Sequence, residues 1–282
     1  MSSILTNNGA MVALQTLKSV NDNLTETQNA ISTGKEIGTA KDNAAVWAIS
    51  KTMESDIAGF EAIEEGLAIG EATVAVASAG AEQIVEKLTE IKELLVSAQS
   101  ENVDHAKIQT DIDSKVAQVE AIISAAQFNG ANLLASDIDG SGASSMGVLA
   151  SLDRVGAGGA VTAVEITIAT VDFESNLDLS SSLTSVTDTA SAASALGEIE
   201  TYLQAAITGA AALGASAARL DDQSMFVSKL VDSMTLGVST MTDTNMEEAS
   251  ARLSALQTQQ ELAVQSLTIA NEAPGSLLQL FR

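Results

Sequence analysis

Few residues in this chain could carry out chemistry. His105 is the only histidine, and the 282 residues include no cysteine. One imidazole without a thiol supports neither a Cys-His nucleophile nor a histidine-based metal cluster. The lack of cysteine also removes disulfides and zinc–thiolate sites. Because Asp104 and a polar stretch surround it, we interpret His105 as a solvated residue in the turn that begins a helix.

Two loop sequences resemble ligand sites only in part. Asp137, Asp139 and Ser141 have the spacing of calcium ligands in an EF-hand loop, but Val148 occupies the position of the bidentate glutamate. The glycine-rich run 156–159 precedes a predicted strand and lacks the Gly-Lys-Ser/Thr of a phosphate-binding loop. We interpret both as turns. We therefore expect no catalytic residue, no cofactor and no metal site, and a protein that is not an enzyme.

The charge and hydropathy of the chain argue against two kinds of partner. Asp and Glu number 37 against 13 Lys and Arg, which gives a formal net charge of −24 at pH 7. Nucleic acids and anionic membrane surfaces would be repelled. The most apolar stretch, 67–80, is shorter than the roughly 20 residues that cross a bilayer, so we predict no membrane span. The first residues lack the basic and apolar regions of a secretory signal, so we expect no cleaved signal peptide.

The elements that would position any site are predicted to be long helices. Proline occurs once, at Pro274, so no ring interrupts the helical hydrogen bonds over most of the chain. Apolar residues recur in alternating steps of three and four, which is the spacing of a coiled-coil seam. A capping sequence at 39–42 predicts the start of the first such helix. The small residues Gly70, Ala77 and Ala81 are expected to let a neighbouring helix come close. The seam of this helix comprises Phe60, Ile63, Leu67, Gly70, Val74, Ala77, Ala81, Ile84, Leu88, Ile91 and Leu95.

Two further seams predict the rest of a bundle. The second comprises Ile108, Ile112, Val116, Val119, Ile123 and Ala126. It stops at an Asn-Gly turn sequence, 129–130. The third comprises Ile199, Leu203, Ala206, Ala210, Leu213, Ala217, Leu220, Ser224, Val227, Val231, Met234, Val238 and Met241. A short connection makes the first two helices antiparallel, and we predict that all three share one bundle.

The composition changes to Gly, Ser, Thr and Asp between the second and third helices. There, 146–152 and the β-branched, alternating stretch 161–171 predict two strands of a β-hairpin. The Ser- and Thr-rich stretch that includes 180–182 and runs to Ser191 predicts a surface linker.

Weaker seams lie at both chain ends. The front one comprises Ala10, Leu14, Leu17, Asn21, Leu24, Gln28 and Ile31 and ends at Gly34. The back one comprises Met246, Ala249, Leu253, Leu256, Gln260, Ala263, Leu267 and Ala270. Polar residues within a seam weaken an isolated helix pair while favouring one register. We expect ends that are marginal in the monomer and are ordered by neighbouring copies.

Together these elements predict a mainly α fold. It is an elongated antiparallel helical bundle with coiled-coil N- and C-terminal helices and a small β-hairpin insert. We divide it into an N-terminal axial helix (1–38), bundle helices 1 and 2 (39–135), the hairpin and linker insert (136–190), bundle helix 3 (191–242) and a C-terminal axial helix (243–282). A long helical protein with an apolar seam at each end and no predicted catalytic site is typical of a polymer subunit.

The segment 31–45, Ile-Ser-Thr-Gly-Lys-Glu-Ile-Gly-Thr-Ala-Lys-Asp-Asn-Ala-Ala, resembles the hallmark of bacterial flagellin. The residues that carry this motif are Ser32, Gly34, Ala40, Lys41, Asp42 and Asn43, followed by Trp47. Segments 3–7, 127–130, 270–274 and 277–282 are similar to the opening, Gln-Phe-Asn-Gly and closing motifs of that family. The chain departs from the family at Val46-Trp47, where Gly-Leu is usual, and at Glu36, where many members have Arg. The short stretch between the helices replaces the large outer domains of longer flagellins.

The resemblance implies a structural subunit that assembles into the extracellular flagellar filament for swimming motility. The two ends would pair in its axial core. The polymerisation interface would then include Leu14, Leu17, Leu24, Ile31, Leu253, Leu256, Leu267, Leu280 and Phe281. A hook–filament junction protein, which shares the terminal pattern, and a secreted coiled-coil adhesin are the alternatives.

The resemblance also implies partners. Export would use the flagellar type III apparatus and a cytoplasmic chaperone at the C-terminal segment, and the filament would meet hook-junction and cap proteins. The innate immune receptor of flagellins would contact the region of Leu88, Glu90, Lys92 and Leu94. Because members that it recognises generally carry Arg at the place of Glu90, the resemblance implies weak receptor binding.

Overall fold

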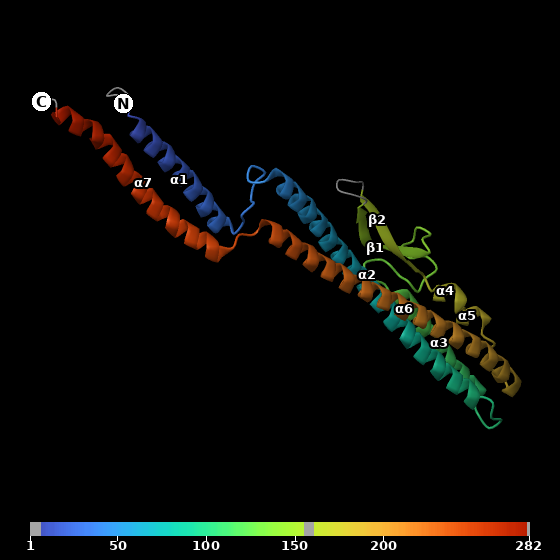
Figure 1. Cartoon of the computed structure of the whole chain (residues 1–282). Coiled ribbons are helices and arrows are strands. Elements are labelled where there is room, and N and C mark those ends of the chain that lie inside the picture. The colour runs from blue at the N-terminus through green and yellow to red at the C-terminus, as the bar shows by residue number, and fades with distance from the viewer. Residues whose placement is uncertain (1–6, 155–160, 281–282) are drawn as a thin grey trace. The chain divides into compact units, whose positions relative to one another are not determined.

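Figure 1 shows the chain as a computed structural model, which describes residues 7–154 and 161–280, with side chains up to Glu272. The predicted turn at 156–159, Phe281 and the side chain of Leu280 lie outside this description. The chain forms two compact units, one of residues up to 57 together with 233 onwards, and the other of residues 58–232. Both boundaries fall inside long helices, so we describe each unit by itself.

The larger unit is built on three long helices, α2 (Ala44–Ser97), α3 (His105–Ala125) and α6 (Thr189–Thr242). All eleven seam positions predicted in α2 are buried, which confirms the periodicity. Along α3, the seam is buried at Ile112, Val116, Val119 and Ile123. Glu90 of α2 pairs with Lys115 of α3, and the carbonyl of Ala98 lies 2.9 Å from His105 Nε2. The contacting residue numbers therefore rise along α2, from 90 to 98, while they fall along α3, from 115 to 105. These two helices are antiparallel, as predicted.

The hairpin consists of β1 (Ser145–Arg154) and β2 (Val161–Ala169), paired antiparallel with an irregularity at Ala150. Its buried face carries Val148, Ala150, Ile166 and Ile168. The amide of Gln223, on α6, donates to the Ala150 carbonyl at 2.8 Å and so satisfies the acceptor at the irregular position. A Cβ at Gly70 would lie 2.9 Å from Val148. The expectation that Gly70 admits a neighbouring helix is therefore wrong, because the close neighbour is strand β1.

The surface linker predicted from 180 to 191 is wrong in part, because 180–182 belong to a short helix. Two short helices, α4 (Phe173–Asn176) and α5 (Leu179–Ser182), follow the N-cap residues Asp172 and Asp178, whose carboxylates accept backbone N–H bonds. Neither helix was predicted, because scattered apolar residues between polar ones have no helical period at this length. Four of these are buried beneath the polar surface, namely Phe173, Leu177, Leu179 and Val186.

The Asn-Gly turn after α3 is confirmed. Asn129 and Gly130 have φ values of 49° and 83°, and Phe128 and Ala131 exchange two backbone hydrogen bonds of 2.9 Å. Positive φ at both central residues defines a type I′ turn, which favours this residue pair.

The other unit contains α1 (Asn8–Thr33) and α7 (Met246–Leu280), which lie side by side. The predicted α7 seam is buried at Ala249, Leu256 and Ala263. On α1 the buried residues are Val20 and Thr27. Leu14 is 59% exposed, so its place in the predicted seam is wrong for this helix pair. Apolar residues occupy more than one face of α1, and the period alone did not select the face that meets α7.

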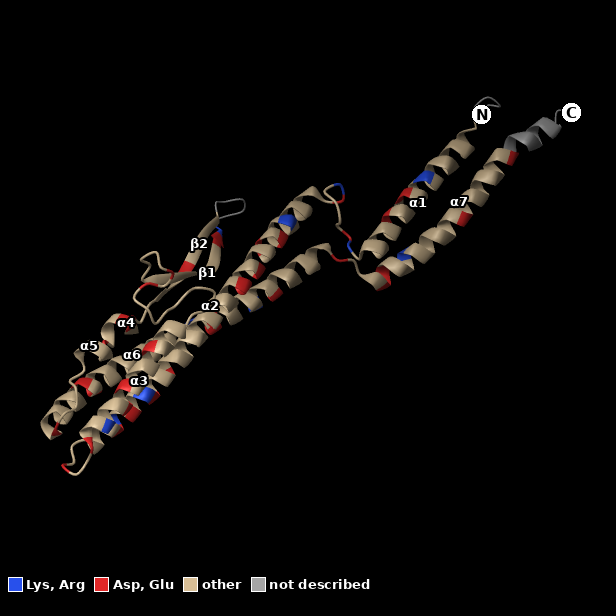
Figure 2. Cartoon of the chain, turned by 180° about the vertical axis from the view of Figure 1, so that it is seen from behind, with Lys and Arg blue, Asp and Glu red and all other residues tan. Residues whose placement is uncertain are grey.

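Acidic residues occur along the long helices. Figure 2 shows Asp and Glu positions on α2, α3 and α7, with fewer Lys and Arg positions among them. Over residues 7–154 and 161–280, none of the helices combines the length and the hydropathy that crossing a bilayer requires.

Candidate functional site

The family-like motif lies in the connection between α1 and α2, where it pairs with the connection between α6 and α7. The Thr242 carbonyl accepts hydrogen bonds from the N–H groups of Glu36 and Ile37 at 2.7 and 3.2 Å, and Thr244 N–H donates to the Gly34 carbonyl at 3.0 Å. We call residues 34–43 and 242–245 the junction. Backbone bonds between these segments, distant in the sequence, fix where α1 ends relative to where α7 begins.

Gly34 ends α1 at the junction. Its φ of 70° is left-handed, a conformation that glycine adopts without a Cβ clash at the end of a helix. The predicted helix stop at this residue is confirmed. Ser32 is exposed on the last turn before it, so the first half of the motif serves the helix terminus.

Asp42 and Asn43 determine the start of α2. The Asp42 carboxylate accepts from the N–H of Thr39 at 2.8 Å, from its hydroxyl at 3.0 Å and from Gly38 N–H at 3.2 Å, and these bonds with Thr39 lower the pKa of Asp42. Asn43 Oδ1 accepts from Val46 N–H at 3.2 Å, in the manner of an N-cap. The predicted start at 39–42 is therefore wrong. Asp42 bonds back into the loop, and α2 begins only at Ala44.

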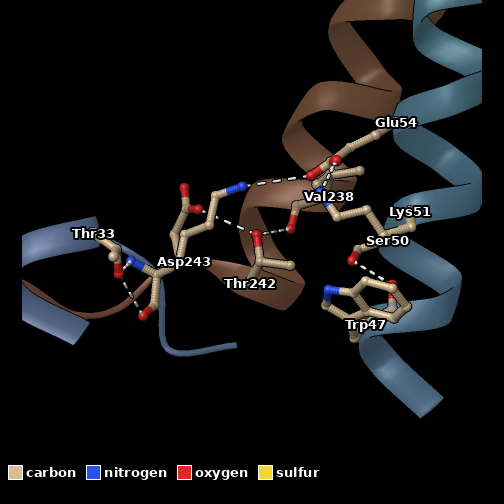
Figure 3. Close-up of polar contacts among 9 residues, drawn as sticks. Thr33, Trp47, Ser50, Lys51, Glu54, Val238, Thr242 and Asp243 are labelled. Carbon is tan, nitrogen blue, oxygen red and sulfur yellow. Dashed lines mark hydrogen bonds and ion pairs between the residues drawn. The ribbon is translucent and has the colours of Figure 1, made fainter. Parts of the chain in front are cut away.

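Figure 3 shows the polar contacts around the junction, where an ion pair joins Glu54 of α2 to Lys35. Glu54 forms ion pairs with Lys51 and Lys35 at 2.5 and 3.5 Å, and these lower the pKa of Glu54. The Thr242 hydroxyl, which is buried, donates to the Val238 carbonyl at 2.9 Å. Trp47 is half-buried beside the buried Ser50, whose hydroxyl donates to the Trp47 carbonyl. Ala40 and Lys41 are exposed.

The residues predicted for the polymerisation interface differ in burial. Leu256 is buried between α1 and α7, and Leu14 is exposed. Half-buried positions are Leu17, Leu24, Ile31, Leu253 and Leu267. The pair also leaves apolar side chains uncovered, with Met11 and Val12 of α1 each 64% exposed and Ile269 of α7 69% exposed.

Two of the polar residues in the terminal seams meet each other. Gln260 Nε2 donates to Asn21 Oδ1 at 2.6 Å, from α7 to α1. A polar pair within a coiled-coil interface favours the register in which both side chains are satisfied. Both residues were predicted as seam positions but not as partners, because the spacing within one helix contains no information on its offset from the other.

The region compared with the immune-receptor contact lies on α2 in the larger unit. Leu88 is fully buried in the seam, while Leu94 is half-buried. Glu90 forms ion pairs with Lys115 and Lys87, which lower the pKa of Glu90, and Lys92 pairs with Glu200 of α6. Through its pair with Lys115, Glu90 links α2 to α3.

In the possible calcium-binding loop, 137–142, carboxylate oxygens accept hydrogen bonds from within the loop. Asp137 accepts from Gly140 and Gly142 N–H groups, and Asp139 accepts from the N–H and hydroxyl of Ser141. Among the described residues no group of three or more His, Cys, Asp or Glu could hold a metal ion. The arrangement of this loop is that of successive turns.

Comparison with known proteins matches this architecture at both ends. The model of the bacterial flagellin N-terminal helical region matches residues 4–138, and that of the C-terminal helical region matches residues 196–281. A flagellin of Brucella melitensis is 41% identical over all of both chains. Flagellin FljM of Caulobacter vibrioides is 38% identical over all of this chain and 99% of that one.

A solved structure, provisionally described as a flagellar hook-associated protein of Vibrio parahaemolyticus, has a similar fold. Its TM-score is 0.50 at 13% identity, over 72% of this chain and all of that one. The family matches cover most of the sequence on both sides of the insert, and the chain belongs to the bacterial flagellin family. Its function is that of a structural subunit of the extracellular flagellar filament. The flagellin relatives favour neither the hook–filament junction protein nor the adhesin.

Proposed function

We propose that the α1–α7 pair forms the axial polymerisation interface of the filament, through Leu14, Leu17, Leu24, Ile31, Leu253, Leu256, Leu267, Leu280 and Phe281. The exposed apolar side chains of α1 and α7 support this role most directly, because they remain in contact with water after the two helices have paired. Leu14 then belongs to contacts between copies instead of the seam within one copy. In this scheme residues 1–38 and 243–282 are the axial part, 39–135 and 191–242 the bundle, and 136–190 the insert.

Labelling of an introduced cysteine tests this role, since the native chain has none to interfere. In Leu14→Cys, we expect maleimide labelling to be at least tenfold slower in filaments than in monomers, because a neighbouring copy covers the position. Thr167→Cys, at an exposed position of β2, is the matched control and should label at similar rates in both states. Equal labelling of Leu14→Cys in both states would contradict the axial role.

The other partners follow from the family and the acidic surface. In this proposal the chain leaves the cell through the flagellar type III apparatus without a cleaved signal, with a cytoplasmic chaperone on its C-terminal segment. In the filament it meets hook-junction and cap proteins. It binds no nucleic acid, consistent with its net charge of −24. It carries no catalysis, no cofactor and no metal.

Weak binding by the innate flagellin receptor is proposed for the region around Glu90, with Lys92 and Leu94 beside it. A receptor site that accepts a guanidinium would meet a carboxylate that is already paired with Lys87 and Lys115. Lost hydrogen bonds and repulsion at such a contact weaken binding. Leu88 is buried in the seam and contributes indirectly, by holding α2 in place.

A receptor-reporter assay tests this binding. The single change Glu90→Arg would place three cations together, so we compare the native chain with Glu90→Arg/Lys115→Glu, which exchanges the charges of the ion pair. We expect the double variant to signal at least tenfold more strongly than the native chain. Lys115→Glu alone is the control and should remain weak. Strong signalling by the native chain would end the hypothesis.

A further inference from the structure

The single proline of the chain removes a hydrogen-bond donor inside α7. In an α-helix the carbonyl of residue 270 accepts from the N–H of residue 274. Residue 274 is Pro274, which has no N–H, yet the helix continues to Leu280. The Ala270 carbonyl therefore lacks its regular helical partner.

Asn7 supplies a donor to this carbonyl from the other end of the chain. Its side-chain Nδ2 lies 2.6 Å from the Ala270 carbonyl oxygen, and its Oδ1 accepts from the N–H of Ala10 at 3.2 Å. One amide thus caps the start of α1 with its oxygen and bonds α7 with its nitrogen. Both residues are half-buried, and a Cβ at Gly9 would lie 3.9 Å from Ala270 Cβ, so the helices are close here.

We propose that Asn7 is a positioning residue that fixes the register of α1 against α7 by replacing the donor that Pro274 removes. Only one residue of α7 upstream of the proline has a carbonyl left free in this way, so the bond identifies one offset between the helices. Together with the Asn21–Gln260 bond, it gives the pair a polar contact in its middle and another near the start of α1. The inference rests on the proposed axial role only where filaments are the readout.

A double-mutant cycle separates this role from ordinary capping. Asn7→Asp retains a side-chain oxygen of equal capping ability but loses the donor to Ala270. Pro274→Ala restores a helical N–H to the same carbonyl. The four chains are the native protein, each single variant and the double variant, compared by the critical concentration for filament formation.

We expect Asn7→Asp in the native background to raise the critical concentration about fivefold to tenfold, the effect of one unsatisfied carbonyl. In the Pro274→Ala background the same change should alter it less than twofold. If Asn7→Asp abolishes filaments, their return in the double variant supports the proposal. Equal effects in both backgrounds, or no return, would show that Asn7 only caps α1.

Amide exchange of α1 in the four monomers gives a readout that does not require assembly. Asn7→Asp should increase exchange of α1 in the native background and change it little with Ala at position 274. A native chain that forms no filaments would contradict the axial role alone, because this cycle can still be measured. Equal increases of exchange in both backgrounds would contradict the register role.

Discussion

Leu256→Asp is expected to abolish filaments while leaving the bundle folded. Leu256 is 7% exposed between α1 and α7, so the variant would place an unpaired carboxylate in an apolar seam. Loss of leucine packing alone costs about 2–5 kcal/mol. The three-helix bundle of residues 58–232 does not include this position and should retain its stability. Sedimentation and electron microscopy measure assembly, and amide exchange of α2 and α3 measures the bundle.

Leu256→Met is the matched control, because it retains the apolar character and nearly the volume of leucine. It should form filaments with less than a tenfold change in critical concentration. Normal filaments from Leu256→Asp would contradict the proposed axial role of the helix pair. Unfolding of the bundle in the same variant would show instead that the two units are not energetically separate.

Gly209→Ala and Gly214→Ala are expected to change the stability of the bundle in opposite directions. Both glycines lie inside α6, five residues apart. A Cβ at Gly209 would lie 2.2 Å from Val171 and 2.6 Å from the ring of Phe173, whereas one at Gly214 would meet nothing within 4 Å. Overpacking at the first site costs about 1–3 kcal/mol. Alanine at the second should gain about 0.5–1 kcal/mol through helix propensity.

Thermal unfolding of the two variants measures this difference. For a unit of this size, 1 kcal/mol corresponds to about 2–4 °C in Tm. The two variants share the same chemical change, so each serves as the control of the other. Stabilisation by Gly209→Ala would show that the segment after the hairpin does not pack against α6 as described.

The seams of the long helices could be predicted from the sequence because burial depends on a local period. Eleven positions of α2 follow one another in steps of three and four, and each is buried. Turn chemistry was equally local, since Asn129 and Gly130 tolerate positive φ and Gly34 favours a helix end. Family membership also came from contiguous motifs, which the comparisons confirm.

The pairing of distant elements was decided only by the tertiary structure. A heptad pattern shows which face of a helix is apolar but not which element packs against that face. The neighbour of Gly70 was therefore predicted to be a helix, whereas it is Val148 of β1. For the same reason Leu14 was predicted in the seam between α1 and α7, whereas it is exposed.

The polar contacts that set register depend on the offset between two chain segments. Gln260 bonds Asn21, Asn7 bonds the carbonyl near Pro274, and Glu90 bonds Lys115. The sequence around each of these side chains does not mark it as a contact residue. Its role in setting register follows only from its distance to the partner. The sequence by itself determined the long helices, the Asn-Gly turn and the family. The tertiary structure decided the register, because hydrogen bonds and ion pairs act over a few ångströms between residues that the sequence separates widely.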